Sequence, residues 1–439
     1  MKYLTTFQRS TLSCADKLSS SLHRIGTKLF GAYPEEGKQP VSERQNKVSA
    51  LLFGLLCAFS VLSQTDVIAA FPYVRLLVIA LWIPAFLYAA VRSRLHLGKH
   101  VLASLFPLVV FDCLVLVIGF VRGCSGVYLS SPIFYAANLS AFVFVTGGLF
   151  GKIAGQDVIK KGIRIYILCT LCVAIYTILT TFFTQGLSSY LYVYSRKNSL
   201  APIVLTAICC VLFLKPFSHK EWHTPLLMIF GTFLVLLKSR SNFIGFFAVL
   251  VIWYIFSLNG KESRKQVFLN LLTAAFLILA VSTLRDLVID NILLNHRASE
   301  GLSGISSGRT DQIAEAVQTP VVQGSRLFGN GYTYIESLPL AVILSYGILS
   351  LIPLVAFAFV PLHAAFCAKR AKLSKGFVLF LFAISVAFLI NGIFEERAPF
   401  GPGTTYFMLW FISGFSLAKE EKNEKNEKNK KSEKNTPSL

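Results

Sequence analysis

Apolar runs long enough to cross a membrane recur along almost the whole chain of 439 residues. A helix of about 17–25 apolar residues spans a bilayer, and only helices and closed barrels satisfy their own backbone hydrogen bonds there. The runs are continuous rather than alternating, which favours helices over barrel strands. Twelve spans are predicted, near residues 48–65, 73–91, 101–121, 129–150, 164–184, 199–215, 224–238, 242–258, 267–284, 339–366, 376–394 and 403–418.

Basic residues are distributed unevenly between the two sides of these spans. The formal net charge is +20, although only 15% of the residues are charged, against about 25% in a soluble domain. Lys and Arg cluster at both ends of the chain and in alternate connections, which are 92–99, 152–161, 215–220, 261–265 and 369–375. Cytoplasmic loops carry such an excess, so we place these segments and both termini in the cytoplasm. The positive charge is then explained by the orientation of the protein in the membrane, and we expect no binding to nucleic acid.

This orientation divides the chain into five parts. In residues 1–46, apolar side chains at three-four spacing are flanked by basic ones, which is typical of an amphipathic helix on the inner membrane surface. Residues 47–284 contain spans 1–9, and residues 339–418 contain spans 10–12. The outward connection 285–338 is long enough to predict a functional loop with its own helices. The Lys-, Glu- and Asn-rich segment 419–439 is predicted to be a disordered, charged cytoplasmic tail.

Several basic residues break the charge pattern, because they fall on the outward side. They are Arg196, Lys197, Lys238, Arg240, Arg297, Arg309, Arg326 and Arg397. Ionisable groups near a bilayer are costly and often mark a substrate path. The planar guanidinium of Arg grips phosphate with paired hydrogen bonds, so we expect a lipid-linked pyrophosphate as ligand. For Arg397, which follows Glu395 and Glu396, a local ion pair is an equally good interpretation.

Four stretches follow one another in order between about residues 190 and 415. They read "SRKNSLAP" (195–202), "LLKSRSNFIGFFAVLV" (236–251), "SSGRTDQIAEAVQ…LFGNGY" (306–332) and "LPLAVILSYGILSLIPLV" (338–355). Together they resemble the O-antigen ligase and polymerase superfamily. The matching features are an outward Arg/Lys-Asn stretch, a Ser-Arg-Ser that opens a span, a loop helix begun by Gly-Arg and followed by Gly-x-Gly, and a Gly-Ile before the next span.

The resemblance implies an all-α polytopic integral membrane protein of about 12 transmembrane helices with one large periplasmic loop, in the bacterial inner membrane. It implies a glycosyltransferase that moves a glycan from undecaprenyl pyrophosphate to a sugar hydroxyl, with no cofactor and no metal. Its partners would be the lipid-linked oligosaccharide donor, a glycan or lipid A-core acceptor, the lipid bilayer and, as a further candidate, a chain-length regulator protein.

Two sets of site residues follow from this expected chemistry. The pyrophosphate-binding candidates are Arg196, Lys197, Arg240, Arg297 and Arg309. The acceptor hydroxyl needs a base, and the candidates on the outward side are Glu336 and His296.

Three functions remain open on these residues. Ligases of the superfamily have a His soon after the Gly-x-Gly, and "GNGYTYIESLPLAV" (329–342) contains none, so we favour a repeat-unit polymerase over an O-antigen ligase. A transporter for the same lipid would also need outward Arg residues. Such transporters show internal repeats or paired broken helices, and we see no such symmetry here.

Overall fold

The structure is a computed structural model that describes residues 43–65, 71, 73–123, 125–182, 197–215, 222–257, 314, 327–331, 334–401 and 405–434. Within these ranges the secondary structure is helical, and no residue belongs to a strand. Six helices are long and apolar enough to cross a membrane, namely Gln45–Leu62, Lys99–Val121, Pro132–Ile153, Gln156–Thr180, Ile348–Arg370 and Lys375–Phe394. The prediction of an all-α, multi-pass membrane protein is therefore confirmed, whereas the count of twelve spans stays a prediction.

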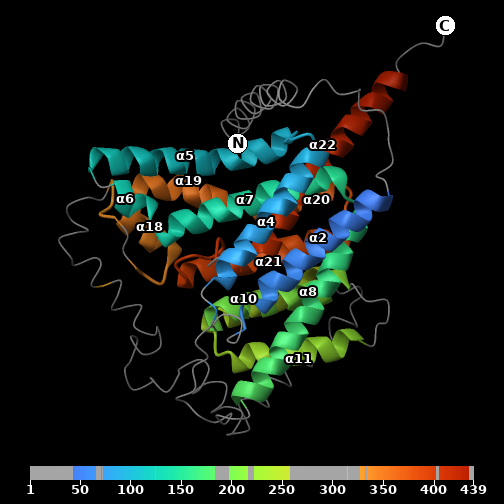
Figure 1. The fold of residues 1–439 in the computed structure, drawn as a ribbon, viewed down its shortest axis with the longest axis horizontal. Helices are drawn as coiled ribbons and strands as arrows, with labels where there is room; N and C mark the ends of the chain where they lie inside the picture. The colour runs from blue at the N-terminus through green and yellow to red at the C-terminus, as the bar shows by residue number, and fades with distance from the viewer. Residues whose placement is uncertain are drawn as a thin grey trace.

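The described helices run back and forth as one bundle (Figure 1). In the first half they are α2 (Glu43–Leu62), α4 (Val74–Arg92), α5 (Lys99–Val121), α6 (Ser125–Leu129), α7 (Pro132–Ile153) and α8 (Gln156–Thr177), which continues as the π-helix η1 (Ile178–Phe182). In the second half they are α10 (Lys197–Cys209) with the π-helix η2 (Cys210–Leu214), α11 (His223–Leu236), α12 (Arg240–Ser257), α18 (Leu338–Tyr346), α19 (Ile348–Ala358), α20 (Val360–Arg370), α21 (Lys375–Phe394) and α22 (Phe407–Lys434).

The predicted spans overlap these helices, apart from 267–284, which lies outside the described residues. The long run 339–366 is interrupted at Gly347, which separates α18 from α19. Gly347 has a φ of +84°, and a Cβ there would overlap the backbone of Leu327. A positive φ and a close backbone approach both require glycine, whereas Pro353 of the same run lies inside α19. Most of the predicted outer loop 285–338 and the predicted surface helix in 1–46 lie outside the described ranges.

Helices α7 and α22 pack in parallel and in very close contact. A Cβ at Gly147 would overlap the backbone carbonyl of Phe411, and a Cβ at Gly151 would lie 2.7 Å from the carbonyl oxygen of Phe415. On the other helix, a Cβ at Gly414 would overlap the carbonyl of Phe144. Small residues spaced four apart let membrane helices approach in this way. Around this pair, α5 lies beside α7 and α19, and α2 lies beside α8 (Figure 1).

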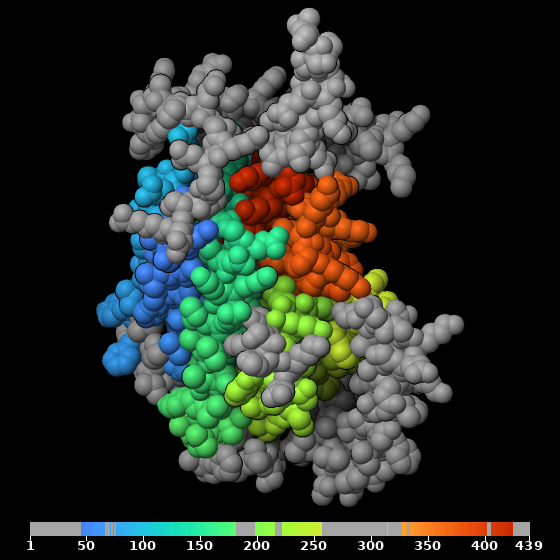
Figure 2. Space-filling view, turned by 90° about the vertical axis from the view of Figure 1, so that its right-hand side faces the viewer, coloured from blue at the N-terminus to red at the C-terminus, as the bar shows by residue number. Residues whose placement is uncertain are grey.

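The second half of the chain packs as a continuous body. Figure 2 shows the orange helices of the C-terminal part lying against the yellow-green segment, and α21 contacts α10 and α12 of that segment. Helix α21 also contacts η2. The start of α12 meets the end of α21, because Ser241 is hydrogen-bonded to Glu395. This packing brings together groups that are far apart in the sequence.

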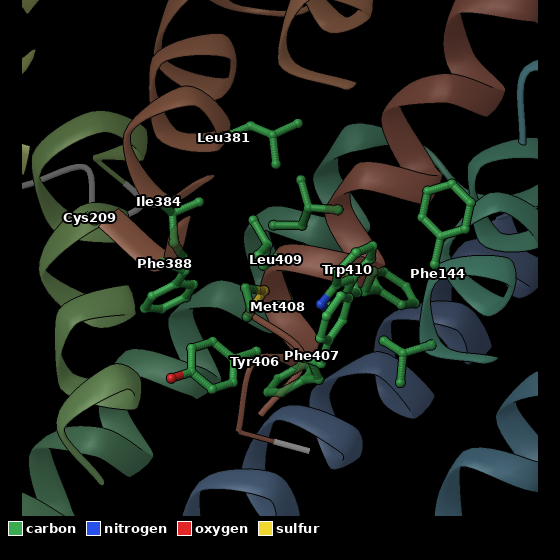
Figure 3. Close-up of a cluster of buried hydrophobic side chains, with 14 of the residues drawn as sticks. Phe144, Cys209, Leu381, Ile384, Phe388, Tyr406, Phe407, Met408, Leu409 and Trp410 are labelled. Atoms are coloured by element: carbon green, nitrogen blue, oxygen red, sulfur yellow. The ribbon is translucent and has the colours of Figure 1, made fainter. Parts of the chain in front are cut away.

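Stacked aromatic rings fix the loop that follows α21. Trp410 of α22 stacks on Phe357 of α19 with ring centroids 4.7 Å apart, and on Phe400 of the loop at 5.6 Å. The indole Nε1 of Trp410 donates a hydrogen bond to the carbonyl of Pro399 at 2.9 Å. The buried cluster around Trp410 extends to Phe144 on one side and to Tyr406 and Phe388 on the other (Figure 3). Residues 395–401 are thus anchored on a rigid core.

The segment 419–434 differs from its predicted disorder, because α22 continues as helix to Lys434. Glu420 and Glu421 are buried, and the carboxylate of Glu421 lies 4.0 Å from the amine of Lys152. Glu424 pairs with Lys99 at 3.6 Å, and the side-chain amide of Asn423 donates to the carbonyl of Ala371 at 2.6 Å. The carboxylates of Glu421 and Glu424 therefore pair with lysines on α7 and α5. A prediction from composition alone does not include such contacts between distant segments.

Candidate functional site

Two of the predicted site residues have described side chains, Arg240 and Glu336. Arg240 is the first residue of α12, and Glu336 lies two residues before α18. The backbone of Lys197 opens α10, but its side chain lies outside the described part, as do Arg196, His296, Arg297 and Arg309 in full. The roles predicted for those five residues remain predictions, and the described part of the site contains Arg240 and Glu336.

The turn between α11 and α12 presents Arg240 at the end of the bundle. Lys238 has a φ of +50°, the left-handed conformation that ends many helices, and its N–H donates to the carbonyl of Val235. Ser239 follows as the residue before α12, and its carbonyl accepts the N–H of Phe243 at 2.9 Å. Ser is a preferred residue at this position. The Ser-Arg-Ser stretch therefore forms the tight entry to α12.

Two hydrogen-bonded connections tie this turn to the end of α21. The hydroxyl of Ser241 donates to Oε1 of Glu395 at 3.1 Å. The side-chain amide of Asn391 donates to Oδ1 of Asn242 at 2.7 Å, and Asn242 in turn donates to the hydroxyl of Ser239 at 2.9 Å. Apart from half-buried Glu395, these side chains are buried. Buried polar groups need such partners, so the network holds Arg240 at a defined place.

Three carboxylates gather at this end of the bundle, from Glu336, Glu395 and Glu396. We call it the Glu336 end. The hydroxyl of Tyr334 donates to Oε1 of Glu336 at 3.3 Å. Partial burial and the charge of Glu336, with smaller effects of Glu396 and Glu395, raise the pKa of Tyr334 to about 12. Tyr334 is therefore a neutral hydrogen-bond donor at physiological pH, and its surroundings are acidic.

Arg397 forms the local ion pair that was one of its two interpretations. Its Nε donates to Oε2 of Glu396 at 3.1 Å, and Glu396 is only 4% exposed. A buried carboxylate needs such a partner. The pair therefore accounts for Arg397 without a ligand.

The Gly-x-Gly stretch at 329–331 lies against α18. The N–H of Asn330 donates to the carbonyl of Leu344 at 2.9 Å, and that of Gly331 donates to the carbonyl of Ser345 at 3.1 Å. Gly329 and Gly331 have φ values of +63° and +88°, and a Cβ at Gly329 would overlap the backbone of Ser345. Both glycines are required by backbone conformation. The two hydrogen bonds attach the end of the long connection 285–338 to α18, the helix that follows Glu336.

Sequence reasoning missed Glu395, Ser241 and Asn391 as parts of the site. Asn391 offered a signal, because it is a polar residue inside the apolar run 376–394 and such residues usually have a purpose. Glu395 was noticed only as a neighbour of Arg397. Its contact with Ser241 joins residues 154 positions apart, and no local pattern reveals such a contact.

The resulting site combines an arginine at a helix N-terminus with carboxylates and neutral hydroxyl and amide groups. The arginine and the first amides of α12 favour an anion, and a carboxylate beside them can accept a proton. No known protein-family model matches the chain, and no curated protein matches it.

Proposed function

We propose that the protein is a membrane glycosyltransferase that moves an oligosaccharide from a polyprenyl pyrophosphate to a sugar hydroxyl. The observation that carries the proposal is the entry to α12. There Ser239 accepts a hydrogen bond from Asn242 and Ser241 donates one to Glu395, so the neighbours of Arg240 on both sides fix the turn beside the carboxylates of the Glu336 end. A pyrophosphate leaving group needs a cation held in place, and preorganised charge is the largest contributor to many enzymatic rate enhancements.

In this proposal the Glu336 end faces the periplasm and the opposite end of the bundle faces the cytoplasm. The basic connections 92–99, 152–161 and 369–375 lie at the opposite end, as the charge bias of membrane proteins requires. The donor is then an undecaprenyl-pyrophosphate-linked oligosaccharide at headgroup depth in the outer leaflet of the bacterial inner membrane. Arg196, Lys197, Arg297 and Arg309 are proposed to complete the pyrophosphate site from outside the described residues.

Repeat-unit polymerisation is the favoured reaction, with the growing glycan as acceptor and a chain-length regulator as a candidate partner. Ligation to lipid A-core is the alternative, and it would use the same donor site. A strain that lacks the protein separates these cases by the banding of its surface glycan. Single-repeat capping indicates a lost polymerase. Unmodified core with polymer accumulating on carrier lipid indicates a lost ligase, and unchanged banding rejects both.

The direct test is the turnover of purified lipid-linked donor by the variant Arg240→Ala. Loss of a hydrogen bond to a charged group costs about 1.5–3 kcal/mol, which corresponds to a roughly 10- to 150-fold lower rate. Arg240→Lys should restore only part of the rate, because Lys keeps the charge and loses the planar fork.

The matched control is Arg92→Ala, which removes an exposed arginine at the end of α4, at the opposite end of the bundle. It should turn over donor at the rate of the parent. If Arg240→Ala also reaches the parent rate at equal protein level, the pyrophosphate does not bind at the entry to α12.

A further inference from the structure

The three carboxylates at the Glu336 end have different surroundings. Glu396 is buried and bonded to the guanidinium of Arg397, one residue away. Glu336 accepts the hydroxyl of Tyr334, in the segment before α18. Glu395 is half-buried and accepts the hydroxyl of Ser241 at 3.1 Å. Glu395 is thus hydrogen-bonded to the helix that begins with Arg240.

We propose that Glu395 is the general base that takes the proton from the acceptor hydroxyl, and that Ser241 is its positioning residue. This inference rests on the proposed glycosyl transfer and replaces Glu336 and His296 as the first candidates for the base. A general base must reach the attacking hydroxyl within hydrogen-bond distance, either directly or through one water. That hydroxyl attacks the carbon bonded to the pyrophosphate, so the base belongs beside the residue that holds the pyrophosphate.

The rigidity of its surroundings supports this role. Glu395 follows the last residue of α21, and Asn391 one turn earlier is bonded to Asn242 of α12. The loop after Glu395 is held by the stacked rings of Phe400 and Trp410. Catalytic groups act best when a rigid scaffold fixes them near the reactive geometry. Glu395 therefore keeps its place relative to Arg240 without help from the ligand.

Charged and titratable groups from several elements face Glu395. Its charge acts on the hydroxyls of Tyr334, before α18, and Tyr406, before α22. Glu396 and Arg397 follow it in the chain, and Arg240 precedes its partner Ser241. Tyr406 is buried, whereas Tyr334 is exposed and can donate to a sugar hydroxyl. The guanidinium of Arg397 is paired with Glu396. The group best placed to accept a proton at neutral pH is the carboxylate of Glu395.

The step balances without a further reactant. The acceptor oxygen forms a bond to the anomeric carbon of the donor sugar, while the bond from that carbon to the pyrophosphate oxygen breaks. The electron pair of the broken bond leaves with the polyprenyl pyrophosphate, whose charge Arg240 offsets. The hydroxyl proton passes to the carboxylate of Glu395, which later releases it to water.

The test compares Glu395→Gln with the parent in polymer synthesis from purified lipid-linked donor, across a range of pH. Gln keeps the shape and an oxygen that can accept the hydroxyl of Ser241, but it cannot take up a proton. The loss of a general base lowers turnover by about 10²- to 10⁴-fold. We expect this loss in kcat, with little change in KM for the donor. We also expect the fall in rate on the acid side of the parent profile to disappear.

Three further variants separate a chemical role from a structural one. Ser241→Ala should slow turnover and keep the acid-side fall, because the carboxylate remains but is less well placed. Glu395→Asp should recover part of the rate. Glu424→Gln is the matched control, a change from carboxylate to amide on α22 at the opposite end of the bundle from Glu395, and it should leave the pH profile of turnover unchanged. Thermal unfolding of each variant shows whether it is folded.

Each outcome decides between the two proposals. If the parent forms polymer and Glu395→Gln keeps both its kcat and the acid-side fall, Glu395 is not the base while the glycosyl transfer stands. If Glu336→Gln removes the acid-side fall instead, the base is Glu336. If the parent transfers no glycan from the lipid-linked donor, the proposed function fails, and the role of Glu395 fails with it. If Glu395→Gln does not fold, an unchanged rate in both Ser241→Ala and Glu395→Asp overturns the proposal.

Discussion

Truncation of α22 gives a sharp test of whether the end of the chain is part of the folded protein. Composition predicts that residues 420–439 can be removed without effect, because a charged, low-complexity segment forms no packed structure. In the structure, residues 420–424 make buried and partly buried contacts with α5, α7, α20 and the turn after α20. Removal of 420–439 and removal of 426–439 should therefore have different effects.

The difference can be estimated from the contacts that the longer truncation removes. The hydrogen bond from Asn423 to the carbonyl of Ala371 contributes about 0.5–1.5 kcal/mol. The partly exposed pair of Glu424 with Lys99 contributes about 0.2–1 kcal/mol. Glu421 is 5% exposed and lies near Lys152, and breaking so buried a pair costs up to about 3–5 kcal/mol. Together these contributions come to at most about 4–8 kcal/mol, a large share of the roughly 5–15 kcal/mol that stabilises a typical protein.

The assay is thermal unfolding of the purified protein in one detergent, followed by tryptophan fluorescence, with polymer synthesis measured on the same samples. The protein lacking 426–439 should unfold at the temperature of the full chain and keep its activity. The protein lacking 420–439 should unfold several degrees lower. Equal unfolding temperatures for the two truncations would show that the contacts of residues 420–424 contribute nothing, and the reasoning would be refuted.

Two further predictions concern stability. Gly414→Val should lower the unfolding temperature strongly, because the new side chain would overlap the carbonyl of Phe144 and overpacking costs about 1–3 kcal/mol or more. The control is Gly155→Ala, where nothing lies within 4 Å of the new Cβ. Equal losses of stability in the two variants would contradict the close packing of α7 and α22. Burial pushes the pKa of Glu424 upward, but the hydrogen bond from His100 and the charges of His100 and Lys99 outweigh it and lower the pKa. This lowering stabilises the folded state above the ordinary glutamate pKa of 4.5, and the contribution is lost as the pH falls through the lowered value. Glu424→Gln should thus lower the unfolding temperature at pH 7 and approach the parent in acid, whereas a difference that stays constant with pH would rule out this pair.

The backbone architecture could be predicted from the sequence, because the bilayer permits few alternatives. A long apolar run must satisfy its own backbone hydrogen bonds, so it forms a helix wherever it lies in the membrane. The predicted spans that fall in the described ranges therefore overlap the helices found there. Arg240 was a site candidate for a similar local reason, since a basic residue at the edge of a span is unusual and calls for an explanation.

Only the tertiary structure decided which groups meet Arg240 at the end of the bundle. Glu395 reaches Ser241 across 154 positions and Asn391 reaches Asn242 across 149, because α12 and α21 pack side by side. The same holds for α22, whose acidic residues find bases on α5 and α7. Hydropathy is a property of each segment alone, whereas hydrogen bonds and ion pairs depend on which helices are neighbours. Local sequence therefore determined where the helices run, and packing between them decided how the site is composed.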